Sequence, residues 1–118
     1  MASDIADLQK RIRDFCSARD WDQFHTPKDM AISLSLEAAE VLEHFQWKNE
    51  AEIAQYLQTN KQDVAEELSD VMYWVLRMAD RFDVDIKDAF EKKLVKNDKK
   101  YPVEKARGNH KKYTEHTL

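Results

Sequence analysis

Four carboxylates recur in two closely spaced pairs, Glu37 with Glu40 and Glu67 with Asp70. Residues three positions apart lie on the same face of an α-helix, so each pair would project both carboxylates from one side of a helix. Mg2+ is a hard ion that prefers oxygen ligands and keeps some waters, which leaves room for phosphate oxygens. Two such pairs facing each other would repel when empty, and a divalent cation would turn that repulsion into binding energy. The spacing therefore predicts a candidate Mg2+ site between two helices.

Spacing alone does not separate a metal site from ordinary surface acids, because 23 of the 118 residues are Asp or Glu. Three features favour the metal site: both pairs border apolar stripes, both acidic stripes end in a tryptophan (Trp47 or Trp74), and a basic segment follows. A di-iron centre would need a Glu-x-x-His step on two helices. His44 is four residues after Glu40, and segment 61–82 has no histidine, so the sequence does not fit that centre.

Aromatic residues near the acidic stripes form a second candidate group. Trp21 and His25 precede the first acidic stripe, Trp47 ends it, and Trp74 ends the second. Flat rings can hold a nucleobase by stacking. The alternative is that these rings fill the core and the ends of helices, and the residue types do not distinguish the two. His25 is expected to make local hydrogen bonds rather than to bind a metal.

A basic segment near the C-terminal end could bind phosphate. From Lys92 onward there are nine basic and three acidic residues, which gives this segment a net charge of +6. Because the whole chain has a net charge of −4, residues 1–91 carry a net charge of −10. At helical spacing, Lys93 shares a face with Asn97, and Tyr101 follows one turn later. The only glycine is Gly108, so no Gly-rich phosphate loop is present. A solvated basic tail is the alternative explanation of the charge.

The elements that would position these residues are helical. One glycine and two prolines leave few places for hairpin turns. Apolar residues at three- and four-residue steps predict helices at about 4–19, 26–47, 60–82 and from 83 or 85 to about 101, with a short one at 50–57. Ser3 and Thr26 are candidate N-caps, with Pro27 in the first helical position and Asp29 placed for a capping box. We expect an all-α domain with a four-helix bundle-like core over residues 1–102, followed by a basic, partly flexible tail at 103–118.

Assembly and location are also expected from the pattern. Ile32, Leu36 and Ala39 fall opposite the main apolar face of segment 26–47. A helix that is apolar on two sides is usually buried on two sides, which predicts a homo-oligomer. The single cysteine, Cys16, allows no intrachain disulfide. The first residues do not resemble a signal peptide, and no apolar run approaches the ~18 residues of a membrane span, so we expect a cytoplasmic location and no membrane contact.

The acidic pairs also resemble a known signature. Glu37-Ala-Ala-Glu40, 26 further residues and Glu67-Leu-Ser-Asp70 are similar to the E-x-x-E…E-x-x-D signature of the MazG-like, all-α nucleoside triphosphate pyrophosphohydrolases. Five surrounding blocks look like the dCTP pyrophosphatase branch of that family. They are Phe24-His25-Thr26-Pro27, Phe45-Gln46-Trp47-Lys48, Glu66-Glu67-Leu68-Ser69-Asp70-Val71, Lys99-Lys100-Tyr101-Pro102 and Lys112-Tyr113-Thr114-Glu115.

The resemblance implies a role for each matching position. The four carboxylates would hold Mg2+, and Glu37 or Glu40 would also accept the proton of the attacking water. Four residues would line the base pocket: Trp21, His25, Trp47 and Trp74. Three would hold the phosphates or the sugar: Lys93, Asn97 and Tyr101. Relatives often carry Tyr where this chain has Trp74, which leaves base selectivity open.

The function expected from this resemblance is Mg2+-dependent hydrolysis of a nucleoside triphosphate to the monophosphate and pyrophosphate, with dCTP or a modified dCTP as substrate. Relatives form dimers that often pair into tetramers, which agrees with the two-sided helix at 26–47. Two alternatives stay open: a related dUTP or broad-specificity pyrophosphohydrolase, and a non-catalytic helical interaction module. Nucleic-acid binding is not expected, because the acidic body would repel a phosphate backbone.

Overall fold

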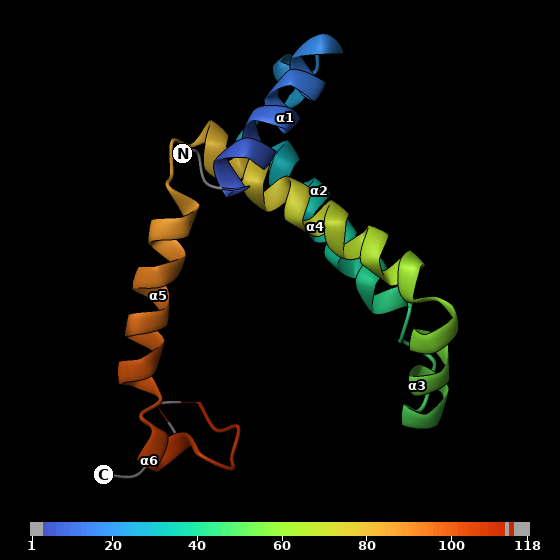
Figure 1. Cartoon of the computed structure of the whole chain (residues 1–118), viewed down its shortest axis with the longest axis vertical. Coiled ribbons are helices and arrows are strands. Elements are labelled where there is room, and N and C mark those ends of the chain that lie inside the picture. Colours follow the sequence, from blue (N-terminus) through green and yellow to red (C-terminus); the bar gives the residue numbers. More distant parts are fainter. Residues whose placement is uncertain (1–3, 113, 115–118) are drawn as a thin grey trace. The chain divides into compact units, whose positions relative to one another are not determined.

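The computed structural model describes residues 4–112 and residue 114, and every regular element in this part of the chain is a helix. The elements are α1 (Asp4–Ala18), the 3-10 helix η1 (Asp22–Phe24), α2 (Pro27–Glu43), α3 (Glu50–Thr59), α4 (Lys61–Arg81), α5 (Ile86–Lys100) and α6 (Val103–Ala106) (Figure 1). The predicted all-α class is confirmed. The chain divides into two units, Met1–Asp83 and Val84–Leu118.

The first unit is organised around α4, which packs against α2 along much of its length and also contacts α1 and α3 (Figure 1). Its buried apolar residues are Cys16, Met30, Val64, Leu76 and Ala79. Gln9 Nε2 also donates a hydrogen bond to the Leu76 carbonyl at 3.1 Å, which ties α1 to α4. The pairing of α2 with α4 is the feature that matters for function, because these two helices carry the acidic stripes.

The second unit contains α5 and α6. Residues 103–106, expected in an extended tail, form the short helix α6 instead. Because α5 belongs to this unit, a four-helix bundle that includes it stays a prediction, as does the domain boundary after residue 102. Ser3, the candidate N-cap of the first helix, lies outside the described residues. None of the helices described is long and apolar enough to cross a membrane.

Three helix starts follow local capping chemistry. Thr26 caps α2 as predicted, with its Oγ1 accepting a hydrogen bond from the Asp29 amide at 3.2 Å and Pro27 in the first helical position. Asp85 caps α5 in the same way, accepting from the Asp88 amide. Asn49 and Glu52 form a reciprocal capping box at the start of α3, which the sequence analysis did not identify.

Helix ends differ from the predicted bounds by one to four residues. The helix expected at 4–19 ends at Ala18, and the one expected at 60–82 ends at Arg81. Asp20 and Asp83 follow these ends with positive φ of 54° and 56°, a left-handed conformation that Asp tolerates and that stops a right-handed helix. The helix expected to reach Trp47 ends at Glu43, and residues 44–47 form turns. The short helix expected at 50–57 continues to Thr59.

Candidate metal site and adjoining aromatic cavity

The packing of α2 on α4 brings three of the four predicted carboxylates together. Glu37 from α2 and Glu67 and Asp70 from α4 each offer an oxygen, and these three oxygens all lie within 4.8 Å of one another. Glu37 and Glu67 are half-buried, whereas Asp70 is exposed. The acidic stripes therefore meet at the edge of the helix pair, as the sequence analysis expected.

Glu40, the fourth carboxylate, lies close to both half-buried members of the cluster, Glu37 and Glu67. Its carboxyl group raises the pKa of Glu67, together with burial of that side chain. The pKa of Glu37 rises to about 7, first because of burial and then because of the neighbouring Glu40, Asp70 and Glu67 carboxyls. Four like charges at this separation disfavour full ionisation, so the cluster tends to keep a proton when no cation balances it.

The cluster also has oxygens that suit a hard cation. Glu37 Oε2 and Glu67 Oε2 are buried and have no hydrogen-bond partner among the described residues. A buried carboxylate oxygen without a donor is costly, and ionised carboxylates can only accept, so they cannot satisfy one another. An all-oxygen donor set with two unsatisfied buried atoms fits Mg2+.

A histidine and a tyrosine border this cluster. His44 Nε2 lies 3.8 Å from Glu67 Oε1, and His44 Nδ1 hydrogen-bonds the Tyr56 hydroxyl. Lys48 Nζ donates to the His44 carbonyl at 2.7 Å and lies over the Tyr56 ring. His44 lies one turn after Glu40 in the sequence, but Tyr56 was not predicted to lie here, because no local spacing links α3 to the acids on α4.

A cavity of about 770 Å³ adjoins the acidic cluster. Its lining comes from α1, the α1–α2 connection and α4: Leu8, Arg11, Ile12, Phe15, Trp21, His25, Asp70, Tyr73 and Trp74. Asp70 belongs to both the cluster and the cavity. A single ligand molecule could therefore occupy the cavity and also contact a cation held by the cluster.

Three of the four predicted base-pocket residues line this cavity. Trp21 packs edge-to-face on Phe15 at 5.6 Å between ring centroids, and His25 packs the same way on Trp74 at 5.2 Å. Trp47 does not line it, and is 86% exposed in the turn after α2. Phe15 and Tyr73 are lining residues that the sequence analysis missed, because Phe15 lies on the apolar stripe of its helix and matches a core residue equally well.

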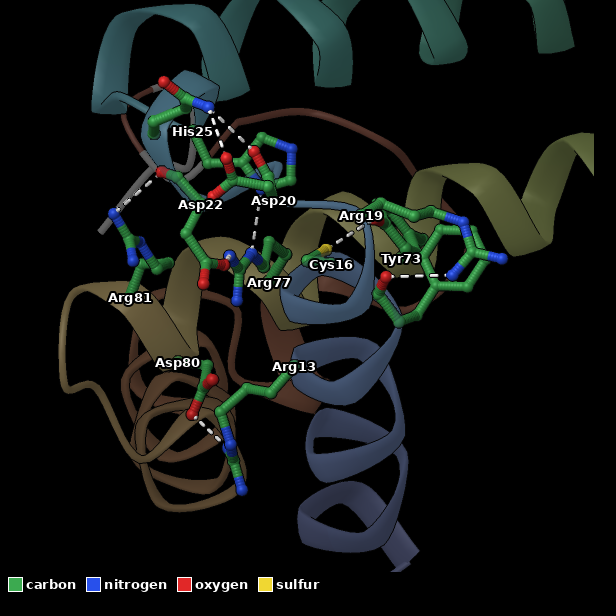
Figure 2. A network of polar contacts seen from close by, with 12 residues as sticks. Arg13, Cys16, Arg19, Asp20, Asp22, His25, Tyr73, Arg77, Asp80 and Arg81 are labelled. Atoms are coloured by element: carbon green, nitrogen blue, oxygen red, sulfur yellow. Dashed lines mark hydrogen bonds and ion pairs between the residues drawn. The ribbon is translucent and has the colours of Figure 1, made fainter.

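A buried arginine, Arg77, donates a hydrogen bond to the His25 ring (Figure 2). Arg77 is only 2% exposed; its Nε donates to His25 Nδ1 at 3.0 Å and its Nη2 donates to Asp22 Oδ1 at 2.5 Å. Burial lowers the pKa of His25, and the charges of Arg77 and Arg81 lower it further. The imidazole thus bonds a residue 52 positions away in the sequence, and the local hydrogen bond of His25 is made by its amide, which donates to the Asp22 carbonyl at 3.2 Å. Arg77 could have been found from the sequence, since it continues the acidic stripe three residues after Trp74.

The predicted phosphate-binding residues all lie in the second unit. Lys93 and Asn97 are one turn apart on α5, and the Tyr101 amide at its C-terminal end donates to the Asn97 carbonyl at 2.8 Å. Lys93 is exposed and Asn97 is half-buried. Their part in a site with the acidic cluster stays a prediction.

Comparison with known proteins places this site in a family. The family model described as MazG-like matches residues 32–115, which include all four carboxylates. Two similar proteins are dCTP pyrophosphatase 1 of Rattus norvegicus, 37% identical over 113 residues, and of Homo sapiens, 35% identical over 113 residues. Each match covers 94% of this chain and 66% of the relative, so the chain spans just under two thirds of the length of these curated relatives.

A solved structure agrees with this assignment. The crystal structure of a pyrophosphatase from Archaeoglobus fulgidus is similar to this chain with a TM-score of 0.81 and 36% sequence identity. The similarity covers 86% of this chain and 95% of that chain. The family resemblance identified from the acidic pairs and the five surrounding blocks is therefore confirmed: the chain belongs to the MazG-like family.

Proposed function

We propose that this protein hydrolyses nucleoside triphosphates to the monophosphate and pyrophosphate with Mg2+, and that dCTP or a modified dCTP is its substrate. The observation that carries the proposal is the convergence of Glu37, Glu67 and Asp70 within 4.8 Å, beside a cavity that Asp70 also lines. The names of the similar proteins, dCTP pyrophosphatase 1 and pyrophosphatase, support the reaction and the cytosine preference.

The residues have separable roles in this mechanism. Glu37, Glu40, Glu67 and Asp70 would hold Mg2+, which when bound neutralises triphosphate charge and acidifies a nearby water. Trp21, His25 and Trp74 orient the base in the cavity, with the triphosphate directed past Asp70. A water attacks the α-phosphorus, its proton passes to Glu37 or Glu40, the bond from the α-phosphorus to the bridging oxygen breaks, and pyrophosphate leaves. Without a cation, burial and the neighbouring Glu40 carboxyl raise the pKa of Glu37 to about 7, and a bound Mg2+ would lower it so that the carboxylate is ionised.

The rest of the expected site and assembly belongs to the same proposal. Lys93, Asn97 and Tyr101 would contact the phosphates or sugar, and Trp47 would reach a base pocket through assembly of subunits. A homodimer or homotetramer is supported by the exposed second face of α2, where Ile32 is 47% and Leu36 is 60% exposed in the single chain. A cytoplasmic location without nucleic-acid or membrane partners completes the proposal.

Product identification tests the reaction. Purified protein is incubated with dCTP, modified dCTP, dUTP and the other nucleoside triphosphates, with and without Mg2+, and products are followed by phosphorus NMR. We expect monophosphate and pyrophosphate only when Mg2+ is present, and isotopically labelled water should place its oxygen in the monophosphate. Release of orthophosphate would contradict cleavage at the α-phosphorus, and exclusive turnover of dUTP would contradict the cytosine preference.

A further inference from the structure

The contact between Arg77 and His25 fixes where the imidazole carries its proton. An arginine guanidinium has five N–H donors and no acceptor. Arg77 Nε donates to His25 Nδ1 at 3.0 Å, so Nδ1 must offer a lone pair. A neutral imidazole with a lone pair on Nδ1 carries its hydrogen on Nε2. Geometry alone therefore selects one of the two neutral forms of His25.

Arg77 is itself immobilised. Its side chain is almost fully buried, and Nη2 donates to Asp22 Oδ1 at 2.5 Å. Asp22 lies in η1, 55 residues from Arg77 in sequence, so this ion pair joins the α1–α2 connection to α4 (Figure 2). Arg81 Nη2 donates to the Asp22 carbonyl at 3.4 Å on the same side. With its carboxylate partner in place, the guanidinium presents Nε to the histidine in a single orientation.

The remaining ring nitrogen of His25, Nε2, is the one that Arg77 does not engage. His25 lines the cavity with Trp21 and Trp74, and its Nδ1 is already engaged by Arg77. A ligand in the cavity would thus meet an aromatic wall and an N–H donor at its edge.

We propose that Arg77, held by Asp22, is a positioning residue that keeps His25 in its Nε2–H form, so that the cavity offers a hydrogen-bond donor to an acceptor nitrogen of the base. This inference rests on the proposed function and names the part of the site that would select cytosine. N3 of cytosine is a hydrogen-bond acceptor, whereas N3 of uracil and thymine carries a hydrogen. A fixed N–H donor on His25 can bond N3 of cytosine, but it faces another N–H donor at N3 of uracil or thymine.

A purely structural role is the competing explanation. In that case Arg77 only ties η1 to α4, and replacing it lowers stability without altering the proton position on His25 or the choice of base. The experiment therefore needs a readout that stability alone does not change.

The first measurement determines which ring nitrogen of His25 carries the hydrogen. The full chain is labelled with nitrogen isotope in histidine, and long-range nitrogen–proton NMR spectra are recorded near neutral pH, with His25→Asn used to assign the signal. The expected wild-type pattern is a single Nε2–H form. Arg77→Met should give a mixture of forms, and Arg77→Lys, which retains a donor, should keep the Nε2–H form. A hydrogen on Nδ1 in the wild type, or an unchanged pattern in Arg77→Met, would overturn the proposal.

The second measurement is base selectivity. Arg77→Met should reduce the ratio of kcat/KM for dCTP to that for dUTP by about tenfold, mainly through KM for dCTP, while Arg77→Lys restores part of it. Arg13→Met is the matched control, because Arg13 is exposed and pairs with Asp80 at 2.7 Å, away from His25; its ratio should equal that of the wild type. An unchanged ratio in a folded Arg77→Met protein contradicts the proposal. If the wild type hydrolyses no nucleotide, the proposed function fails, and the NMR spectra still decide the role of Arg77.

Discussion

Glu37 sits in a cluster that is electrostatically unfavourable without a cation. Its pKa of about 7 means that the folded protein retains a proton there at pH values where the unfolded chain, with a Glu pKa of 4.5, has lost it. The metal-free folded state is therefore expected to lose stability as the pH rises from about 4.5 to about 7, because deprotonation then costs more in the folded than in the unfolded chain. The same deprotonation prepares the cluster for a metal ion.

This linkage gives a prediction for magnesium binding. Saturating Mg2+ should raise Tm more above about pH 7 than below about pH 5, because protons compete for the same carboxylates at low pH. Thermal unfolding with and without Mg2+ at both pH values measures the effect. Glu37→Gln should reduce this difference, whereas Glu43→Gln, an exposed acid on the same helix, should preserve it. An equal magnesium shift at both pH values would refute the link to the cluster.

Removal of a single cluster carboxylate tests catalysis. Glu37→Gln should lower kcat for pyrophosphate release by about 100-fold or more, because one change removes a magnesium ligand and a candidate proton acceptor. The variant should remain folded at neutral pH, since it removes one charge from a group of like charges. Glu43→Gln again serves as the control with normal turnover. Full turnover in Glu37→Gln would show that this carboxylate is neither a required magnesium ligand nor the proton acceptor.

At the scale of single residues, helical spacing in the sequence predicted which side chains share a helix face. The two acidic pairs share helix faces, and one packed interface brought them together. Tyr56 and Asp22 could not be found in this way, because they reach His44 and Arg77 from other elements of the fold. His25 and Trp74 were two of the four base-pocket residues predicted from the sequence, but the arginine that orients His25 was overlooked.

At the scale of elements, the α2–α4 pair is the scaffold of the site, and α3 supports it from one end. The helix types and most starts were predictable from apolar periodicity and from capping residues such as Thr26. The end of α2 was not, because Phe45 and Trp47 continue an apolar pattern beyond Glu43. The chain instead turns there, and Asn49 starts α3 with its own capping box.

That capping box has a measurable effect. Asn49→Ala removes the side-chain acceptor for the Glu52 amide and should lower the free energy of unfolding by about 1 kcal/mol in urea titrations. Gln58→Ala, an exposed change on the same helix, should stay within about 0.5 kcal/mol of the wild type. Because Tyr56 lies on α3, the Asn49 variant should also loosen the hydrogen bond between the Tyr56 hydroxyl and His44. A free energy of unfolding equal to that of the wild type would show that the cap contributes nothing.

At the scale of the whole molecule, the second apolar face of α2 is where we expect another subunit to bind. Ile32 and Leu36 lie exposed in the single chain, on the face predicted from the sequence to be covered by another subunit. The spacing of Ile32 and Leu36 predicted this face but not the surface that would cover it, because apolar periodicity within one helix does not specify its partner.

Light scattering after size-exclusion chromatography tests this expectation. The wild type should have a mass of two or four chains, and Leu36→Glu should reduce it by placing a charge in an apolar contact. Lys28→Glu, an exposed charge change near the start of the same helix, should leave the mass unchanged. A wild-type protein with the mass of one chain would contradict the homo-oligomer.

The single thiol of the chain has a practical consequence. Cys16 is fully buried, and its Sγ lies 3.1 Å from the hydroxyl of Tyr73, a residue of the cavity wall. A reagent that alkylates thiols can reach Cys16 only when α1 separates from α4, so the labelling rate reports how often this wall opens. A nucleotide held against Tyr73 and Trp74 should slow the labelling, which gives an occupancy signal that does not require turnover.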